Sequence, residues 1–434
     1  MPPAIPMSLL ASLRSPAPAL VLLGASLFSP AAHAAANWPH WRGPTENGHA
    51  AGANLPAKID AAQVHWKTPL PGKGCSTPIV WNQRIYLTAP HEGKDAVLAF
   101  DWAGQRLWQT DLGAEAPGRH RNGSGSNPSP VTDGQRLFVA FKSGNLAALD
   151  LDGKLLWQTD LAGKFGPVKL FWDFGTSPTV TEKFVIMARM HEGDSWLAAF
   201  DKQTGELRWK TARNYPTPRE VDNGYTTPLV IRHAGREALL TWGAQHLTAH
   251  DAADGKLLWS CGGFNPDSTP LWPAVASPVV VGDMAIVCFG RADKGAPRLH
   301  GIKLGGSGDV TATHRVWSRQ DTGAFVPTPA AYQDRVYVLS DRGQLDCLDP
   351  RTGQTLWSGT LPRTNSNFYT SPLIANGLLY AAREDGATYV VRIEKGFEPL
   401  GETKFDDRVI ASFVAAGDRL FIRGASHLYC MASP

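Results

Sequence analysis

Two copies of the tripeptide His-Glu-Gly offer the side chains best suited to metal chemistry. They stand at His91-Glu92-Gly93 and His191-Glu192-Gly193. Imidazole nitrogens and carboxylate oxygens bind zinc, but a structural site closes only with four ligands at short spacing. Two separated pairs fall short of that set. We therefore interpret the tripeptides as repeated turn sequences and predict no metal site.

The aspartate and cysteine patterns do not predict a metal site either. The turn Asp-Leu-Asp-Gly at 150–153 begins like a calcium loop but lacks the downstream Glu and the alternating ligands. The five cysteines stand singly, at Cys75, Cys261, Cys288, Cys347 and Cys430. Because their number is odd and no CxxC pair exists, at least one thiol is expected to stay unpaired. The last three lie in apolar, strand-like runs and are expected to be small buried hydrophobes.

The sequence patterns of the common catalytic sites are absent. The chain has no nucleophile elbow, no HExxH motif and no phosphate-binding glycine loop. Ser124 and Ser126 follow His120 in a Gly/Ser-rich segment, a spacing that turns of this composition produce without any catalytic role. We therefore predict no catalytic residue.

A repeated pattern must position whatever binding chemistry remains. The stretch LAALDLDGKLLW at 146–157 recurs as LAFDWAGQRLW at 98–108, LAAFDKQTGELRW at 197–209, LTAHDAADGKLLW at 247–259 and LDCLDPRTGQTLW at 345–357. A looser copy ends at Trp317 and a decayed copy ends at Leu400. In each copy an apolar run, an Asp/Gly turn and a second apolar run predict a β-hairpin.

Each repeat opens with a Ser/Thr-Pro step that is followed by two further strand-like runs. The steps begin at Thr77, Ser129, Ser177, Thr227, Ser277, Thr328 and Ser371. Proline is tolerated at the first position of a strand because its missing N–H is not needed there. Each unit is therefore predicted to be a four-stranded antiparallel meander. The units repeat about every 40 to 50 residues, which is the period of propeller blades.

The two ends of the chain complete this architecture. Residues 412–434 contain three strands and stop before a fourth, whereas QVHWKTPL at 63–70 is a fourth strand with no unit before it. The N-terminal strand is predicted to complete the last blade, because closing the ring removes exposed sheet edges. The predicted fold is an all-β, eight-bladed β-propeller over residues 63–434.

A tryptophan stands in the fourth strand of most units. These residues are Trp66, Trp108, Trp157, Trp209, Trp259, Trp317 and Trp357. We expect each of them to cover the gap between the outer strand of its own blade and the neighbouring blade. This is a structural docking role rather than a role in ligand binding.

The N-terminal residues indicate an exported protein. Residues 1–34 carry one basic residue, Arg14, then an apolar run at 19–28 and the small triplet Ala32-His33-Ala34. This order predicts a signal peptide cleaved after Ala34, with Met7 as an alternative start. The mature chain is expected to be periplasmic or secreted, with neither a lipid anchor nor a transmembrane segment.

The charge balance argues against nucleic-acid binding, and the segment after the leader has a composition of its own. With 42 Lys+Arg against 39 Asp+Glu, the chain lacks the basic excess of a nucleic-acid binder. Residues 35–62 are expected to be a lid or linker. Within them, WPHWRGPTENG at 38–48 is expected to be strapped across one propeller face by Trp38 and Trp41.

The Asp, Gly and Trp of the repeat, as in Asp150, Gly153 and Trp157, resemble the tryptophan-docking repeat of pyrroloquinoline-quinone (PQQ) dehydrogenases and BamB-like propeller proteins. The resemblance covers roughly residues 63–434, and a WPxWRGP segment at 38–44 adds to it. It implies the propeller fold and, for BamB-like members, a non-catalytic role. PQQ dehydrogenases carry two adjacent cysteines and a calcium site. Neither is matched in this chain, so no cofactor is expected.

Loops that join the fourth strand of one blade to the first strand of the next should share a face with the loops between strands two and three. The inter-blade loops are rich in aromatic residues and Arg, the composition of a partner-binding surface. The candidates for contact with a partner are Arg119, Arg121, Phe171, Trp172, Tyr215, Arg219, Tyr225, Trp272, Phe325, Phe368, Tyr369 and Arg408. We expect a monomeric scaffold that binds an envelope or secreted protein or peptide.

Two alternatives remain open. In a PQQ-dependent dehydrogenase or a PQQ-binding sensor, the resemblance implies that Trp172 would stack on the cofactor and that Asp173 or Asp407 would lie near a calcium ion. The same aromatic loops would suit a small quinone or a carbohydrate as ligand.

Overall fold

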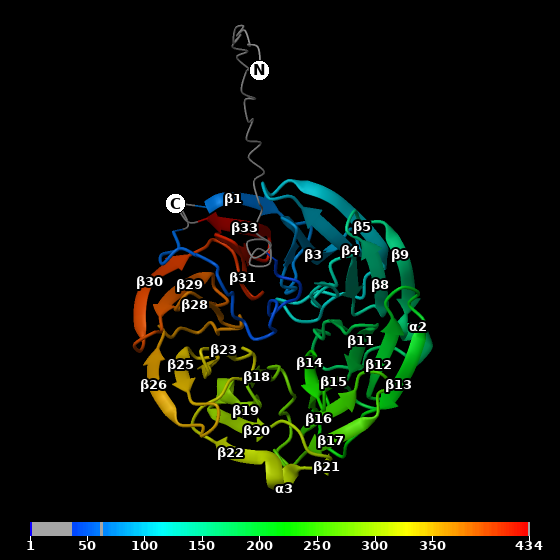
Figure 1. The fold of residues 1–434 in the computed structure, drawn as a ribbon, viewed down its shortest axis with the longest axis vertical. Coiled ribbons are helices and arrows are strands. Elements are labelled where there is room, and N and C mark those ends of the chain that lie inside the picture. Colours follow the sequence, from blue (N-terminus) through cyan, green and yellow to red (C-terminus); the bar gives the residue numbers. More distant parts are fainter. Residues whose placement is uncertain (2–36, 61–63, 433–434) are drawn as a thin grey trace.

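The computed structural model describes Met1, residues 37–60 and residues 64–432, so the predicted signal peptide lies outside the described residues apart from Met1. Eight antiparallel sheets stand side by side in a closed ring (Figure 1). The colours of the ribbon pass once around the ring, so the blades follow one another in chain order. The predicted eight-bladed β-propeller is confirmed.

Seven blades are formed by strands that follow one another in the chain, except that β21 (Gly308–Asp309) intervenes within blade 5. Blade 1 has β2 (Ile79–Trp81), β3 (Arg84–His91), β4 (Lys94–Phe100) and β5 (Arg106–Ala114), and blade 2 has β6 (Val131–Thr132), β7 (Arg136–Ala140), β8 (Asn145–Asp150) and β9 (Leu155–Asp160). Blade 3 has β10 (Thr179–Val180), β11 (Phe184–Arg189), β12 (Trp196–Asp201) and β13 (Leu207–Ala212), and blade 4 has β14 (Leu229–His233), β15 (Arg236–Gly243), β16 (His246–Asp251) and β17 (Leu257–Cys261). Blade 5 has β18 (Val279–Val281), β19 (Met284–Arg291), β20 (Ala296–Lys303) and β22 (Arg315–Arg319), and blade 6 has β23 (Ala330–Tyr332), β24 (Arg335–Leu339), β25 (Gln344–Leu348) and β26 (Thr355–Thr360). Blade 7 has β27 (Leu373–Ala375), β28 (Leu378–Ala382), β29 (Ala387–Arg392) and β30 (Glu398–Lys404).

The eighth blade joins the two ends of the chain. Its inner strands are β31 (Val414–Ala416), β32 (Arg419–Arg423) and β33 (His427–Ala432), and its outer strand is β1 (Val64–Pro69). β1 pairs antiparallel with β33, with Trp66 opposite Cys430, and the two strands lie next to each other in Figure 1. The prediction that an N-terminal strand completes the last blade is confirmed.

One sheet departs from the predicted four strands. The short strand β21 (Gly308–Asp309) pairs in parallel with β17, so the sheet of blade 4 has a fifth strand. β21 and helix α3 (Thr311–His314) belong to the connection between β20 and β22, where other blades have a short Asp/Gly turn. Helix α2 (Leu161–Phe165) and the 3-10 helix η2 (Ala292–Lys294) are the remaining helical turns of the described residues.

The core lies between neighbouring blades. β8 buries its four central residues, whereas β9 alternates exposed and buried positions. A blade therefore covers both faces of its second and third strands with its neighbours and leaves its outer strand half in water. This pattern explains why the third strands read as continuous apolar runs and the fourth strands alternate.

A β-bulge repeats in the outer strands. In blade 2, Ala148 pairs with Trp157 and Leu149 with Leu155, which leaves Leu156 as the extra residue. A bulge strengthens the local twist and turns the neighbouring side chain. The small residue opposite the indole leaves room for it, and Leu156 faces solvent with 42% of its surface exposed.

Five of the repeated tryptophans make the same contact with the next blade. Each indole N–H donates to a backbone carbonyl of the next hairpin turn: Trp66 to Trp102, Trp108 to Leu151, Trp157 to Lys202, Trp209 to Ala252 and Trp317 to Pro350. The indole also packs on the turn glycine. A Cβ atom at Gly205 would lie 2.6 Å from the Trp157 ring, and its φ of +72° disfavours other residues as well.

Trp259 and Trp357 are held differently. Within residues 37–60 and 64–432, neither indole N–H has a hydrogen-bond partner. The hairpin turn that would accept the bond lies in blade 5 for Trp259 and in blade 7 for Trp357. These are the two blades in which the Asp/Gly pattern is lost. Trp259 is fully buried, and Trp357 packs beside Phe397 at 6.5 Å between ring centroids.

The Trp157→Ala variant should lower the free energy of unfolding by about 3 to 5 kcal/mol, because it removes a large buried aromatic side chain. Leu156→Ala is the matched control, since it shortens the adjacent exposed residue of the same strand and should change stability by less than about 1 kcal/mol. Urea unfolding followed by circular dichroism measures both. Equal unfolding midpoints for Trp157→Ala and wild type would contradict the docking role.

Candidate functional site

Residues 37–60 cross the propeller along its innermost strands, and we call them the strap. The strap makes backbone contacts with four blades: Trp38 with Val80, Pro39 with Thr132, Asn47 with Ala331 and Ala50 with Ile374. Each partner lies three positions after the Ser or Thr of its Ser/Thr-Pro step, on the side away from the inter-blade loops. The strap therefore lies at the end of the central channel opposite those loops.

Arg42 anchors the strap near the axis. It is 2% exposed, and its guanidinium donates to the carbonyl oxygens of Pro329 at 2.8 Å and Pro372 at 3.0 Å. Burial lowers the pKa of Arg42 to about 9. The guanidinium lies 5.6 Å from the centroid of the Trp41 ring. Arg42 thereby holds Trp41 at the end of the channel.

The Ser/Thr-Pro steps form a ring of hydrogen bonds around the channel. In each link the backbone N–H of one Ser or Thr donates to the hydroxyl oxygen of the next: Thr77 to Ser129, Ser129 to Ser177, Ser177 to Thr227, Thr227 to Ser277, Ser277 to Thr328, Thr328 to Ser371 and Ser371 to Ser412. The distances are 2.9 to 3.1 Å. At the seam between blades 8 and 1, Arg423 instead donates to the carbonyl oxygen of Ser76 at 2.9 Å.

The channel holds a cavity of about 390 Å³. The eight side chains of the hydroxyl ring line it, Trp41 reaches it from the strap, and aromatic residues of the inter-blade loops line it from the other side. Trp172 belongs to these loops and is 45% exposed, so the cavity opens to solvent there. A volume of this size suits a small ligand.

Asp173 is a cavity carboxylate that is fully engaged by the protein. It accepts hydrogen bonds from the backbone N–H groups of Arg119 and His120 and pairs with Lys142 at 2.8 Å. Burial acts to raise the pKa of Asp173, but the bonds from Lys142 and the two N–H groups outweigh it and hold that pKa below its usual range. This carboxylate therefore stays ionised and ties three loop segments together.

Arg291, Asp293 and Asp341 line the cavity on the side of blades 5 and 6. Arg291 forms a bidentate pair with Asp293, and its guanidinium lies 4.3 Å from the centroid of the Phe325 ring. Asp341 is fully buried and accepts the N–H groups of Phe325 and Val326 at 2.7 and 3.1 Å. Burial raises the pKa of Asp341 to about 6.

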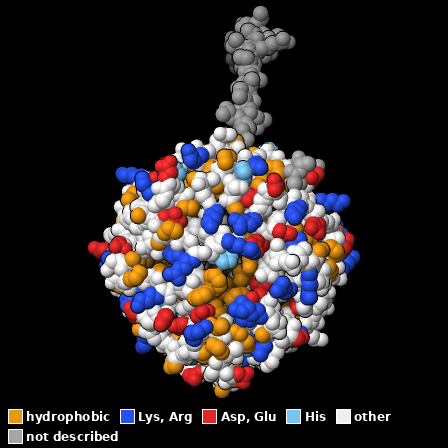
Figure 2. Space-filling model, turned by 180° about the vertical axis from the view of Figure 1, so that it is seen from behind, with side chains coloured by type: hydrophobic (Ala, Val, Ile, Leu, Met, Phe, Trp, Pro, Cys, Tyr) orange, Lys and Arg blue, Asp and Glu red, His pale blue; other side chains and the backbone are white. Residues whose placement is uncertain are grey.

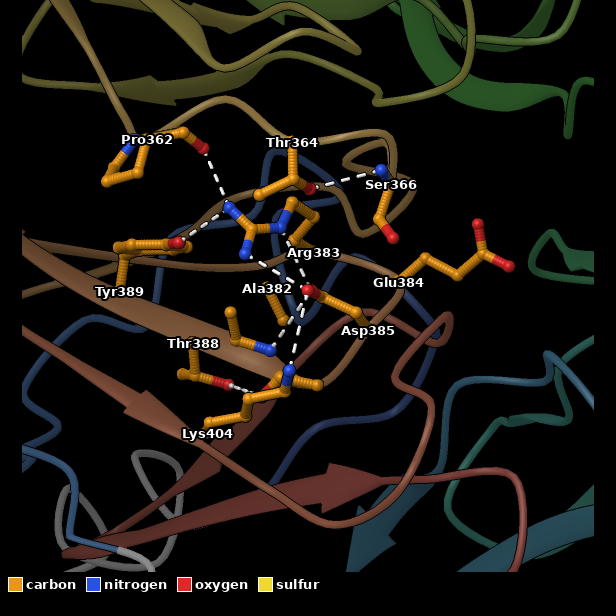
Figure 3. Close-up of polar contacts among 12 residues, drawn as sticks. Pro362, Thr364, Ser366, Ala382, Arg383, Glu384, Asp385, Thr388, Tyr389 and Lys404 are labelled. Carbon is orange, nitrogen blue, oxygen red and sulfur yellow. Dashed lines mark hydrogen bonds and ion pairs between the residues drawn. The ribbon is translucent and has the colours of Figure 1, made fainter.

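A polar network ties the loops at the mouth of the channel. Glu384, 4% exposed, pairs with Arg121 at 2.8 Å and accepts the Asn122 side-chain N–H at 2.8 Å. Figure 3 shows Glu384 pointing away from its neighbour Arg383, whose guanidinium donates to the carbonyl oxygen of Pro362, to Asp385 and to the hydroxyl oxygen of Tyr389. The Arg383 cluster fixes the loop, and Glu384 links blade 7 to the loop before blade 2.

The structure separates the predicted site residues into three groups. Trp172, Asp173, Tyr225, Phe325 and Tyr369 line the cavity. Exposed around the loops are Arg119, Arg121, Phe171, Arg219 and Arg408. The remaining four lie outside the cavity lining and are engaged within the protein. Tyr215 stacks on His246, and the Trp272 ring meets Phe289 edge-on. Phe368 is 1% exposed in the core, and Asp407 accepts hydrogen bonds from Ser426 and Tyr429.

Hydrophobic side chains gather near the centre of the face in Figure 2, and Lys and Arg side chains surround them. Phe171 and Trp172 are 51% and 45% exposed, and their rings meet at right angles with centroids 4.8 Å apart. His120 supports the indole from the next loop, with 5.4 Å between the ring centroids. The two aromatic rings thus contact each other and form a solvent-facing apolar surface.

Several site residues were missed from the sequence because they lie in the hairpins between strands two and three. Asp341 and Glu384 belong to the segments SDRG at 340–343 and REDG at 383–386. The charged residues of these hairpins were the available signal, since both loop types were expected on one face. The Ser/Thr-Pro steps were recognised as strand starts, but the ring they form depends on neighbouring blades.

The donor set of this cavity does not fit a calcium ion with PQQ. Asp173 is neutralised by Lys142, and the Asp407 carboxylate accepts hydrogen bonds from the protein and has a side chain only 4% exposed. Among residues 37–60 and 64–432, no group of three His, Cys, Asp or Glu side chains could hold a metal ion. His91 and His191, from the two His-Glu-Gly copies, hydrogen-bond to Gln109 and to the backbone N–H of Lys169. All five cysteines are free thiols.

Comparison with known proteins supplies a family and a fold. The profile of a family described as outer membrane protein assembly factor BamB matches residues 51–224, 94–319 and 306–399. A protein of that name from Moranella endobia (strain PCIT) is 25% identical over 333 residues, which cover 73% of this chain and 77% of the relative. The crystal structure of BamB from Moraxella catarrhalis is similar with a TM-score of 0.61 and 15% identity, over 84% of this chain and 96% of that one. The crystal structure of quinohemoprotein alcohol dehydrogenase from Comamonas testosteroni is similar with a TM-score of 0.65 and 13% identity, over 93% of this chain and 81% of that one. These two structures are evidence for the fold alone.

Replacing Asp341 by Asn should change how stability depends on pH. The folded protein favours protonated Asp341, whose ordinary pKa is 3.8. Its contribution to stability is therefore full below pH 3.8 and is lost as the pH rises through about 6. The unfolding free energy of wild type minus that of Asp341→Asn should fall by roughly 3 kcal/mol across this window. Urea unfolding at several pH values measures it, and a difference that does not change with pH would contradict the raised pKa.

Proposed function

Because the chain belongs to the family of outer membrane protein assembly factor BamB, we propose that it is a non-catalytic scaffold that binds protein or peptide partners through the face formed by its inter-blade loops. The names of its relatives refer to the assembly of outer membrane proteins, which supports a protein as the partner. The partner itself is expected to be an envelope or secreted protein.

The exposed aromatic pair Phe171 and Trp172 is the observation that carries this proposal. Aromatic side chains that are half exposed and rigid give a large contact area at little cost in conformational entropy. Arg119, Arg121 and Arg408 are exposed on the same set of loops. Arg is enriched at interface hot spots together with Trp and Tyr. This combination of aromatic and Arg side chains supports a partner protein or peptide whose contact surface carries apolar side chains and some negative charge.

The engagement of the loop carboxylates supports a non-catalytic role. Asp173 and Asp407 both accept several hydrogen bonds from the protein itself. A general base or a metal ligand needs a lone pair that the fold leaves free. The polar groups at the mouth thus act to hold the loops in one shape, which favours binding without a large entropic cost.

We also propose export of this protein, with residues 1–34 as the signal peptide. The sequence of the leader supports this location, as does the relatives' name, which refers to outer membrane protein assembly. In the part of the chain that the structure describes, no helix is long and apolar enough to span a membrane.

Partner capture tests the proposal. Purified protein crosslinked in an envelope extract should retain a specific partner above a bead control. The double variant Phe171→Ser with Trp172→Ser should lower recovery at least about tenfold, since hot-spot aromatics contribute 2 kcal/mol or more. Recovery is measured by quantitative mass spectrometry at equal bait.

Leu155→Ser with Leu156→Ser is the matched control. These adjacent leucines are 40% and 42% exposed, fractions similar to those of Phe171 and Trp172. They lie on the outer strand β9 rather than on a loop. The control should retain the partner in full. Equal loss in both double variants, or no partner above the beads, would overturn the proposal.

A further inference from the structure

The hydroxyl ring of the axial cavity has donor capacity that the protein does not use. A hydroxyl group donates one hydrogen bond and accepts two. Seven ring hydroxyls, from Ser129 to Ser412, accept a backbone N–H from the preceding blade. Across residues 37–60 and 64–432, no protein acceptor is found for their own protons.

These free protons belong to side chains that line the cavity. Buried donors are nearly always partnered by protein, ordered water or ligand. Their occupant must therefore offer several hydrogen-bond acceptors around one axis. Asn122, Asn127 and Asn367 also line the cavity and add amide groups that donate and accept.

The charges around the cavity are already compensated. Lys142 neutralises Asp173, and Arg291 neutralises Asp293 while it also attracts Asp341. Burial, followed by the charge of Arg121, lowers the pKa of His120, so the imidazole is neutral at pH 7. An anionic occupant would find no free cation in the lining. The occupant that fits is uncharged and polar.

Aromatic rings supply the second half of the recognition surface. Trp172, Tyr225, Phe325 and Tyr369 line the cavity on the loop side, and Trp41 lines it at the strap. Flat apolar faces beside a few placed polar groups are the usual composition of a small-ligand site. A sugar ring presents an apolar C–H face together with hydroxyl groups that both donate and accept.

We propose that the axial cavity binds a neutral saccharide of the size of a mono- or disaccharide. Its hydroxyl oxygens accept from the Ser/Thr ring, its hydroxyl protons donate to the Asp341 carboxylate, and one apolar face of the sugar lies against Trp172. This site shares Trp172 with the protein-binding surface proposed above but otherwise lies inside the channel, and it needs no metal or cofactor.

Isothermal titration calorimetry of the whole folded chain tests the proposal. The probes are maltose, cellobiose and N,N′-diacetylchitobiose, with digalacturonate and diglucosamine as anionic and cationic comparators. At least one neutral disaccharide should bind saturably with a Kd of about 1 mM or tighter. If no neutral disaccharide binds up to roughly 10 mM, or if only a charged comparator binds, the proposal is wrong.

Variants assign the binding to the cavity. Trp172→Ala and Asp341→Asn should each weaken the saccharide at least about tenfold. Asp346→Asn is the matched control, because Asp346 is also a buried, hydrogen-bonded carboxylate of blade 6 but lies outside the cavity lining. The control should bind as wild type does. Unchanged affinity in both cavity variants, with thermal unfolding confirming that each is folded, would overturn the proposal.

Discussion

The pairing of β1 with β33 is the contact on which the rest of the molecule depends. It joins residues from the two ends of the described chain in one sheet, so the last blade is complete only when the ring is closed. Closure gives every blade a neighbour on each side, which is what buries both faces of the second and third strands. Trp66 then contacts the first blade as Trp108, Trp157, Trp209 and Trp317 contact the blades that follow them. The seam therefore turns a linear repeat into a rigid ring.

The ring in turn determines the shape of the channel. Seven of the eight ring hydroxyls, from Ser129 to Ser412, accept a backbone N–H of the preceding blade, so the ring joins each blade to the next. The strap closes one end because Arg42 satisfies two carbonyl groups of these same steps. At the other end Asp173 and Glu384 hold the loops by bonds between blades. Polar groups inside the channel thus serve first to join blades, and what they leave unused defines the proposed ligand.

The fold could be predicted from sequence because the same local turn and strand signals recur from blade to blade. Within one unit, Asp150 accepts the turn hydrogen bond, Gly153 adopts the positive φ of the turn, and Trp157 contacts the next blade. All three are local features of the sequence. One exception was also local: the connection between β20 and β22 in blade 5 lost the turn pattern and supplies β21 to the sheet of blade 4, and Trp259 of blade 4 has no carbonyl partner. A repeat with a short period leaves little choice of topology once closure is required.

The sequence by itself determined the number of blades, their strand order and the closing role of the N-terminal strand, because these follow from apolar periodicity and turn residues within each unit. The tertiary structure alone decided which loop residues meet at the axis. Phe368 and Trp172 come from loops of the same kind, yet the first is buried in the core and the second stands exposed at the cavity. Asp341 and Asp173 reach one cavity from blades on opposite sides of the ring. Such juxtapositions depend on contacts between units far apart in the chain, and no pattern within a single repeat encodes them.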